Sequence, residues 1–201
     1  MSITAVLLDM DGVLLDSFEA WCAVMNATAV HFGLPPISRD AFGQAFGQSN
    51  EADVERFYPG QTVESVEAQY AACFDEYAAA VTAMPDAAWL LEALDGRGIP
   101  TAVVTNTPSV IARAMLEAVG VIPHALVGSS DVPMPKPAPD MLFRACHVLG
   151  TEPWDVLMVG DSLFDKQAAA AAGCSFAGLG VAGNFTISGL REVLGIVDGT
   201  A

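Results

Sequence analysis

Residues 3–17 read ITAVLLDMDGVLLDS, and this stretch decides the fold. Its apolar first part, Ile3–Leu8, has the length and composition of a strand buried on both faces of a sheet. Two carboxylates, Asp9 and Asp11, follow at the place where an α/β sheet usually presents its ligand crevice. Because Asp and Gly also favour turns, this stretch alone leaves a ligand site and a simple turn about equally open.

Four more apolar runs of strand length follow along the chain: Thr101–Thr105, Ala125–Gly128, Val156–Val159 and Ser175–Leu179. Helical patterns separate them: Asp86–Arg97, Ser109–Val119, Pro139–Leu149 and Phe164–Ala172. A glycine stands at the end of each helical pattern, where helices commonly terminate. This alternation predicts a doubly wound α/β fold, in which helices cover both faces of a parallel sheet.

Residues 17–82 break the alternation. They contain no convincing strand, but several helical stretches separated by turn residues. The predicted helices are Phe18–Phe32, Arg39–Phe46, Glu51–Phe57 and Val63–Val81. We therefore expect an α-helical domain, residues 17–82, inserted into an α/β core made of residues 1–16 and 83–201.

A second pair of carboxylates, Asp161 and Asp165, follows the predicted strand Val156–Val159. Parallel strands present their carboxyl ends at one edge of the sheet, so this pair should converge with Asp9 and Asp11. Such clustering is unfavourable unless a hard cation neutralises it, and carboxylate and carbonyl oxygens suit magnesium. Asp165 has the weaker case, because it could equally cap the helix that follows.

The run from Thr105 to Pro108 ends a predicted strand and leads into a helix, a place that suits a phosphate group. Helix capping explains Thr107 and Pro108 almost as well, so Thr105 and Asn106 are the candidates for phosphate binding. Lys136 lies in a proline-rich loop and is one of two lysines in the chain. A lone lysine is usually a surface charge, but in so acidic a chain a braced one can neutralise a phosphate.

The composition narrows the choice of partners. The chain has 8 Lys and Arg against 24 Asp and Glu, a formal net charge of -16, which repels nucleic acid and anionic lipid. No apolar run reaches the ~18 residues of a membrane span, and the first residues lack a signal-peptide pattern. Four scattered cysteines suggest neither a disulfide framework nor a zinc site. We expect a cytoplasmic protein with no nucleic-acid or membrane partner, and the sequence does not indicate its oligomeric state.

Four motifs in order, DMDGVLLDS, VVTNTP, PKPAPD and GDSLFD, resemble those of the haloacid dehalogenase-like superfamily. The helical insertion after the first motif resembles the small cap of the subgroup that contains phosphoglycolate phosphatases and β-phosphoglucomutases. The resemblance spans almost the whole chain. It implies a Rossmann-like core that binds Mg²⁺ and acts on a phosphate ester.

The resemblance also implies catalytic roles. Asp9 would be the nucleophile and Asp11 the general acid/base, while Thr105 and Lys136 would bind the phosphoryl group. Asp161 would bind magnesium together with Asp9 and the backbone carbonyl of Asp11, and Asp165 would reach the metal through water or orient a neighbour. A carboxylate nucleophile suits this chemistry, because an aspartyl-phosphate divides hydrolysis into two easier displacements.

Among the activities of the superfamily, a magnesium-dependent phosphatase acting on a small phosphorylated metabolite, phosphoglycolate-like or a sugar phosphate, fits best. A dehalogenase does not need Asp11, and a phosphonatase-like enzyme needs a cap lysine, which residues 17–82 lack. A sugar-phosphate mutase is the alternative, although Arg39, Arg56 and His31 are the only cap residues that could grip a second phosphate. A catalytically idle binding protein on the same fold is the alternative from another class.

The stretch Phe46-Gly47-Gln48-Ser49-Asn50 resembles the substrate-facing cap loop of phosphoglycolate phosphatase-like enzymes, although a plain interhelical turn is about as good an interpretation. On this basis Gln48, Ser49, Asn50 and Arg56 are candidates for substrate specificity. We expect the cap to close over the crevice and to bring these residues toward the leaving group.

Overall fold

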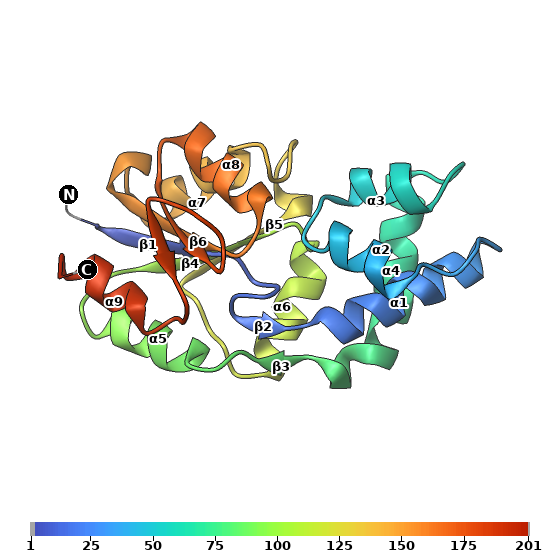
Figure 1. The fold of residues 1–201 in the computed structure, drawn as a ribbon, viewed down its shortest axis with the longest axis horizontal. Helices are drawn as coiled ribbons and strands as arrows, with labels where there is room; N and C mark the ends of the chain where they lie inside the picture. The colour runs from blue at the N-terminus through green and yellow to red at the C-terminus, as the bar shows by residue number, and fades with distance from the viewer. Residues whose placement is uncertain (1–2, 201) are drawn as a thin grey trace.

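The computed structural model describes residues 3–200, and Figure 1 shows a sheet with helices on both faces beside a second, helical part. The main sheet is parallel and has the order β5-β4-β1-β6-β7-β8. Its strands are β1 (Ala5–Leu8), β4 (Thr101–Thr105), β5 (Ala125–Gly128), β6 (Val156–Gly160), β7 (Ser175–Leu179) and β8 (Phe185–Ile187). The predicted doubly wound fold is confirmed.

Alternate residues of each strand point to opposite faces, which gives the core two apolar layers. Val6 and Leu8 of β1 pack in the layer that contains α5 (Ala87–Asp95), α6 (Ser109–Ala118) and α9 (Glu192–Val197). Ala5 and Leu7 pack in the layer that contains α7 (Asp140–Leu149) and α8 (Leu163–Ala172). The central strand is therefore buried on both sides, as its apolar sequence predicts.

The helical part contains α1 (Phe18–His31), α2 (Arg39–Ala45), α3 (Asn50–Phe57), α4 (Val63–Tyr77) and the 3-10 turn η1 (Ala78–Ala80). We call residues 17–82 the cap. Its helices α1 and α4 pack against each other. The chain enters and leaves through an antiparallel pair of short strands, β2 (Leu15–Asp16) and β3 (Thr82–Ala83). This pairing joins the cap to the core through two adjacent strands.

Most predicted helices lie within a few residues of their expected bounds, and the glycines expected to end four of them, Gly98, Gly120, Gly150 and Gly173, all have positive φ. The prediction of one helix over Val63–Val81 is wrong at its end, because the helix tightens into η1 after Tyr77. Further short elements lie outside the predicted set: β2, β3, β8, α9, η2 (Ser129–Asp131) and η3 (Pro153–Asp155). Segments this short carry too few residues for a periodic pattern. Within residues 3–200 no helix is long and apolar enough to cross a bilayer.

Candidate active site

The predicted site residues meet at the carboxyl edge of the sheet. Asp9 and Asp11 follow β1, Thr105 ends β4, and Asp161 follows β6. In chain order the core strands run 3-2-1-4-5-6 across the sheet, so β1 and β6 flank the point where the order reverses. Ligands of such sheets bind at this point.

Lys136 is the centre of a buried network. Its side chain is 2% exposed, and its Nζ donates to Asp9 Oδ1 at 2.7 Å, to Asp165 Oδ1 at 2.7 Å and to the Val104 carbonyl oxygen at 2.9 Å. Burial alone would lower the pKa of Lys136, but Asp165 and Asp9 outweigh it and raise the pKa above its usual value. Lys136 is therefore a fixed positive charge beside the Asp9 carboxylate.

Asp165 has both carboxylate oxygens occupied. Oδ1 accepts from Lys136, and Oδ2 accepts from the backbone N–H and the hydroxyl of Ser162. Ser162 caps α8 in return, by accepting from the Asp165 N–H at 3.2 Å. Gly160 makes room for this arrangement, since a Cβ there would lie 2.4 Å from the Asp165 Cβ. Asp165 both caps α8, as the sequence allowed, and orients Lys136.

Asp9, Asp161 and Asp165 each offer an oxygen, and these oxygens lie within 4.8 Å of one another. Burial and the Asp165 carboxylate raise the pKa of Asp9 well above its usual range and raise the pKa of Asp161 to about 6. Gly12 has φ +85° and lets the Asp161 carboxylate approach, since a Cβ there would meet Oδ2 at 2.1 Å. A hard divalent cation would offset the repulsion among these acids, so the donor set fits magnesium.

Asp11 accepts hydrogen bonds at both oxygens. Oδ1 accepts from the Ser17 hydroxyl and from Trp21 Nε1 at 3.1 Å, and Oδ2 accepts from Thr107 Oγ1 at 2.9 Å and Thr105 Oγ1 at 3.3 Å. Burial raises the pKa of Asp11, and the bonds from Ser17, Thr107 and Trp21 oppose that rise. The carboxyl group is held in one orientation between the core and α1 of the cap.

Three of these hydrogen-bond partners of Asp11 were not predicted from the sequence: Thr107, Ser17 and Trp21. The structure corrects the assignment of Thr107 to helix capping: Pro108 is the N-cap of α6, and Thr107 donates to Asp11. Ser17 and Trp21 lie at the start of a cap helix and give no local signal of contact with the acid pair. A hydroxyl two residues after Thr105 could have suggested Thr107, because alternate residues tend to face the same way in an extended chain.

The Asn106 side chain braces two loops. Its Nδ2 donates to the Gly47 and Lys136 carbonyl oxygens at 3.0 Å each, and its Oδ1 accepts from the Lys136 N–H at 2.9 Å. These bonds fix the lysine loop and hold the cap loop against the core. The side chain is thereby engaged by protein, while phosphate binding at this position stays a prediction.

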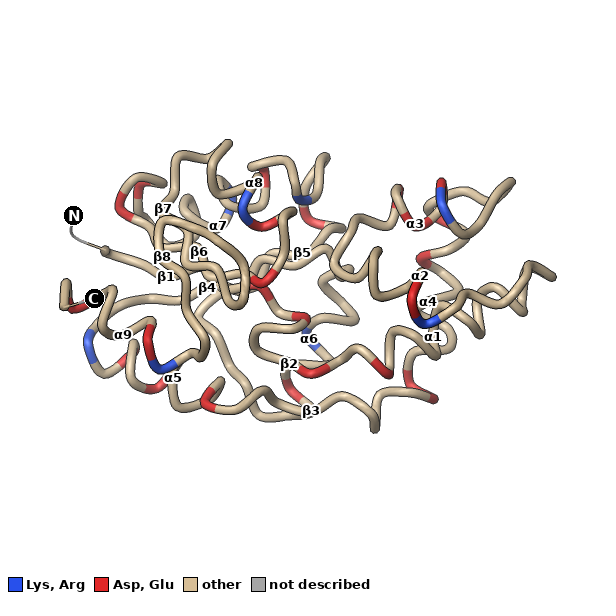
Figure 2. The backbone as a smooth tube through the Cα atoms, in the orientation of Figure 1, with Lys and Arg blue, Asp and Glu red and all other residues tan. Residues whose placement is uncertain are grey.

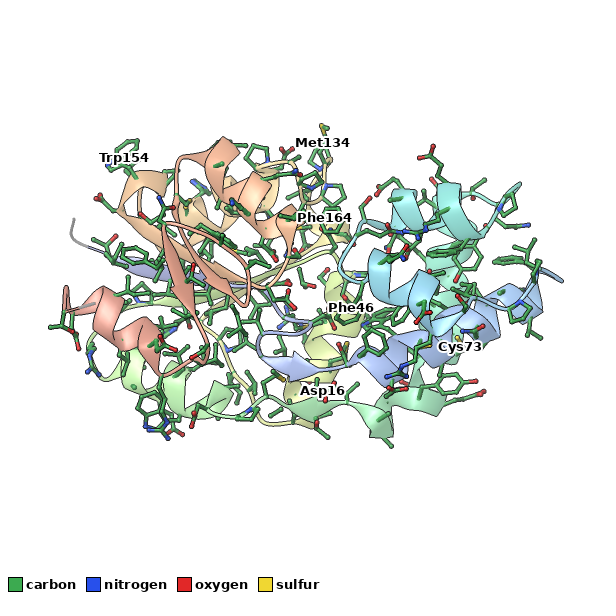
Figure 3. All side chains as sticks on the ribbon, in the orientation of Figure 1. Asp16, Phe46, Cys73, Met134, Trp154 and Phe164 are labelled. Atoms are coloured by element: carbon green, nitrogen blue, oxygen red, sulfur yellow. The ribbon has the colours of Figure 1, made fainter. Side chains whose placement is uncertain are left out.

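A cavity separates the core and cap, and its core wall comprises Asp9, Asp11, Thr105, Asn106 and Thr107. Polar residues of the cap wall are Gln48, Asn50, Asp53 and Tyr70, beside aromatic side chains that include Phe46. Figure 3 labels Phe46 on the side of the cap that faces the core. The centres of water molecules can lie within about 50 Å³ of this cavity, so it has room for at least a few waters.

The cap candidates divide into two groups. Gln48 and Asn50 line the cavity, as a role in specificity requires. Ser49 is instead the N-cap of α3 and accepts from the Ala52 N–H. Arg56 is exposed, bonds to Gln44 at 3.1 Å and stacks on the Phe57 ring, so it is not part of the cavity wall.

Known proteins resemble this chain in sequence and in fold. Among curated relatives, a phosphoglycolate phosphatase of Yersinia pseudotuberculosis is 30% identical, with 89% of this chain and 81% of that one covered. An N-acetylmuramic acid 6-phosphate phosphatase of Pseudomonas aeruginosa is 31% identical, with 86% and 80% covered. A crystal structure from Lactobacillus plantarum shares the fold at a TM-score of 0.86 and 21% identity, over 96% of this chain and 99% of that one. The family model for haloacid dehalogenase-like hydrolases matches residues 6–179, and the chain belongs to this family.

Proposed function

We propose that this protein is a magnesium-dependent phosphatase that hydrolyses a small phosphorylated metabolite through an aspartyl-phosphate intermediate on Asp9. Membership of the hydrolase family and phosphatase relatives support an enzyme of the phosphatase type. The observation that carries the finer proposal is the buried contact of 2.7 Å between Lys136 Nζ and Asp9 Oδ1. It places a fixed cation beside a carboxylate that can attack phosphorus.

Asp9 acts as the nucleophile, and its phosphorylation expels the substrate alcohol. Lys136 stabilises the negative charge on the transferring phosphoryl group and lowers the repulsion between that group and the Asp9 carboxylate. Asp165 keeps Lys136 in place through its bond of 2.7 Å. Thr105 and the backbone N–H groups that lead into α6 bind the phosphoryl oxygens, with Asn106 fixing the lysine loop.

Asp11 transfers the proton. Its carboxyl group protonates the departing alcohol and then takes a proton from the water that hydrolyses the phosphorylated Asp9. The raised pKa of Asp11 favours the protonated form that the first step needs. Ser17, Thr107 and Trp21 hold the group in orientation during both steps.

Asp9, Asp161 and the backbone carbonyl of Asp11 would hold the magnesium ion, and Asp165 would act through water. When bound, the ion neutralises charge on the phosphoryl oxygens and on the clustered acids. The proposed domain division, with the core at residues 1–16 and 83–201 and the cap at 17–82, places all of these ligands on the core. The cap then completes the cavity on the leaving-group side.

The substrate is a small phosphate monoester, since a phosphate group is what the names of both relatives' substrates share. A mutase that grips two phosphates gains no support, because Arg39 and Arg56 do not line the cavity. We also propose the cytoplasm as the location, since phosphorylated metabolites are found there and the three buried thiols Cys73, Cys146 and Cys174 suit a reducing compartment.

The test is turnover of a generic aryl phosphate by purified protein with magnesium, compared with Asp9→Asn. We expect the variant to fold and to lose activity by about 10³-fold or more, because no other group on the core wall replaces the nucleophile. Acid quench with a labelled substrate should trap phosphate on the wild-type chain and none on the variant. A wild-type protein without turnover on any phosphate ester, or a variant with near-normal kcat, would reject the proposal.

A further inference from the structure

The cap wall of the cavity holds a buried carboxylate that catalysis does not use. Asp53 is 8% exposed, lines the cavity, and accepts from Gln48 Nε2 at 2.7 Å and from the Tyr70 hydroxyl at 3.1 Å. Tyr70 also contacts the Tyr58 hydroxyl at 3.2 Å, and Tyr58 donates to the Met25 carbonyl oxygen at 3.0 Å. This chain of bonds fixes Asp53 at the leaving-group end of the site.

The same wall presents further acceptors. Asn50 Nδ2 donates to Glu67 Oε1 at 2.7 Å, and Gln48 Nε2 is used by Asp53. The amide oxygens of Gln48 and Asn50 accept no hydrogen bond from any residue in the described range 3–200. Each amide nitrogen also keeps a second N–H, so a hydroxyl on the leaving group could donate to an amide oxygen and accept from an amide N–H.

No Lys, Arg or His of residues 3–200 lines the cavity. Arg39 pairs with Glu19 on the exposed side of the cap, Arg56 bonds to Gln44, and His31 packs on Phe32 while exposed. Lys136, on the core side, is bonded to Asp9 and Asp165. Figure 2 shows how few Lys and Arg positions the cap contains.

We propose, as an extension of the phosphatase function above, that Asp53 with Gln48 and Asn50 selects phosphate esters whose leaving group is uncharged and carries a hydroxyl, and rejects those that carry a carboxylate. A carboxylate here would meet a buried acid without a compensating cation, and like charges in contact discriminate strongly.

The cap wall is matched to a hydroxyl group. Burial raises the pKa of Asp53 to about 7, so the anionic form that repels a carboxylate predominates above neutral pH. Its two oxygens already accept from Gln48 and Tyr70. The remaining acceptors on this wall are amide oxygens, which pair with a hydroxyl without desolvating an ion.

Matched substrates test this selection. Hydroxyethyl phosphate and phosphoglycolate differ only by a CH₂OH group in place of a carboxylate, and glycerol phosphate and phosphoglycerate form a second such pair. We expect kcat/KM with magnesium to favour the hydroxyl member of each pair by about tenfold or more. Equal or better turnover of the carboxylate members, or a preference for phosphoethanolamine, would overturn the inference. No turnover of any ester, aryl phosphate included, would instead reject the phosphatase function itself.

Variants of the cap wall test whether its residues cause the preference for hydroxyl substrates. Asp53→Asn should reduce the preference for the hydroxyl member at least threefold, because it removes one buried like charge. Glu51→Gln, on the exposed side of the same helix, is the matched control and should leave the ratio unchanged. If Asp53→Asn fails to fold in a melting assay, Gln48→Lys provides the second test, because a cation on this wall should raise turnover of the carboxylate members. An unchanged ratio in a folded Asp53→Asn or in Gln48→Lys would contradict the assignment.

Discussion

The core side of the cavity gathers charges, whereas the cap wall surrounds one buried acid with neutral hydrogen-bonding groups. Behind the core wall, Lys136 lies 2.7 Å from both Asp9 and Asp165, and Asp161 completes the acid cluster. On the cap wall, one buried acid is balanced by hydrogen bonds from Gln48 and Tyr70. The first arrangement suits a phosphoryl group and a cation, and the second suits the neutral part of an ester. With the proposed function, chemistry and specificity would therefore lie on different parts of the chain.

Removal of magnesium should cause the largest loss of turnover among the changes to the core side of the site. EDTA should abolish turnover and magnesium should restore it, because the acid cluster is unfavourable without a hard cation. Asp161→Ala should need far more metal for the same rate, measured as activity against magnesium concentration. Full activity after dialysis into EDTA would contradict the metal assignment.

Asp11→Asn should have the next effect, a loss of about 10²–10⁴-fold in kcat. The amide cannot protonate the departing alcohol or accept a proton from water, so both steps slow. Because Asp9 remains, acid quench should still trap a phosphorylated chain. A variant that turns over like wild type, with contamination excluded, would remove Asp11 from the proton transfer.

Much of the core side of the site could be predicted from the sequence because several of its residues lie at the end of a strand of a parallel sheet. The edge where those strands end is shared, so Asp9, Asp161 and Thr105 converge whatever the details of the helices. Lys136 could be located only through its proline-rich loop and the resemblance between motifs. Thr107 was assigned to the helix cap because a Thr before a helix reads as a cap, and tertiary contact with Asp11 decides otherwise.

The cap wall could not be predicted in the same way. Asp53 is one of several acids on α3, a pattern that is typical of a solvent-exposed helix face. Its partner Tyr70 lies on a different helix, α4. Helical periodicity does not say which helix packs on which, so nothing local joins these two residues. Gln48 and Asn50 were found through a loop resemblance, and the same resemblance also selected Ser49, which caps a helix instead.

Single alanine substitutions in the loop 46–50 should distinguish the residues that line the cavity from Ser49, which caps a helix. Gln48→Ala and Asn50→Ala remove groups that line the cavity, so they should change the ranking of substrates by several-fold in kcat/KM while magnesium affinity stays constant. Ser49→Ala should leave the ranking unchanged and cost about 0.5–2 kcal/mol of stability, since it removes a helix cap. The substrate panel and urea unfolding separate the two outcomes, and a changed ranking in Ser49→Ala alone would reverse the assignment.

The smallest expected effect is a pH dependence of stability that belongs to Asp53. Burial raises its folded pKa to about 7 from the usual 3.8, so the folded chain holds a proton that the unfolded chain releases across this interval. Stability from this group is therefore greatest below about pH 4 and falls as the pH rises toward 7, by a few kcal/mol at most. Asp53→Asn removes the titration, and its amide can still accept from Tyr70 while Gln48 turns to present its oxygen. The free energy of unfolding of the variant, relative to wild type, should accordingly rise between pH 5 and pH 8. Urea unfolding at both pH values measures this difference, and Glu51→Gln corrects for the loss of one charge from an acidic chain. A difference that stays flat, or that falls with pH, would show that Asp53 is not buried in the way that its place in the cap wall requires.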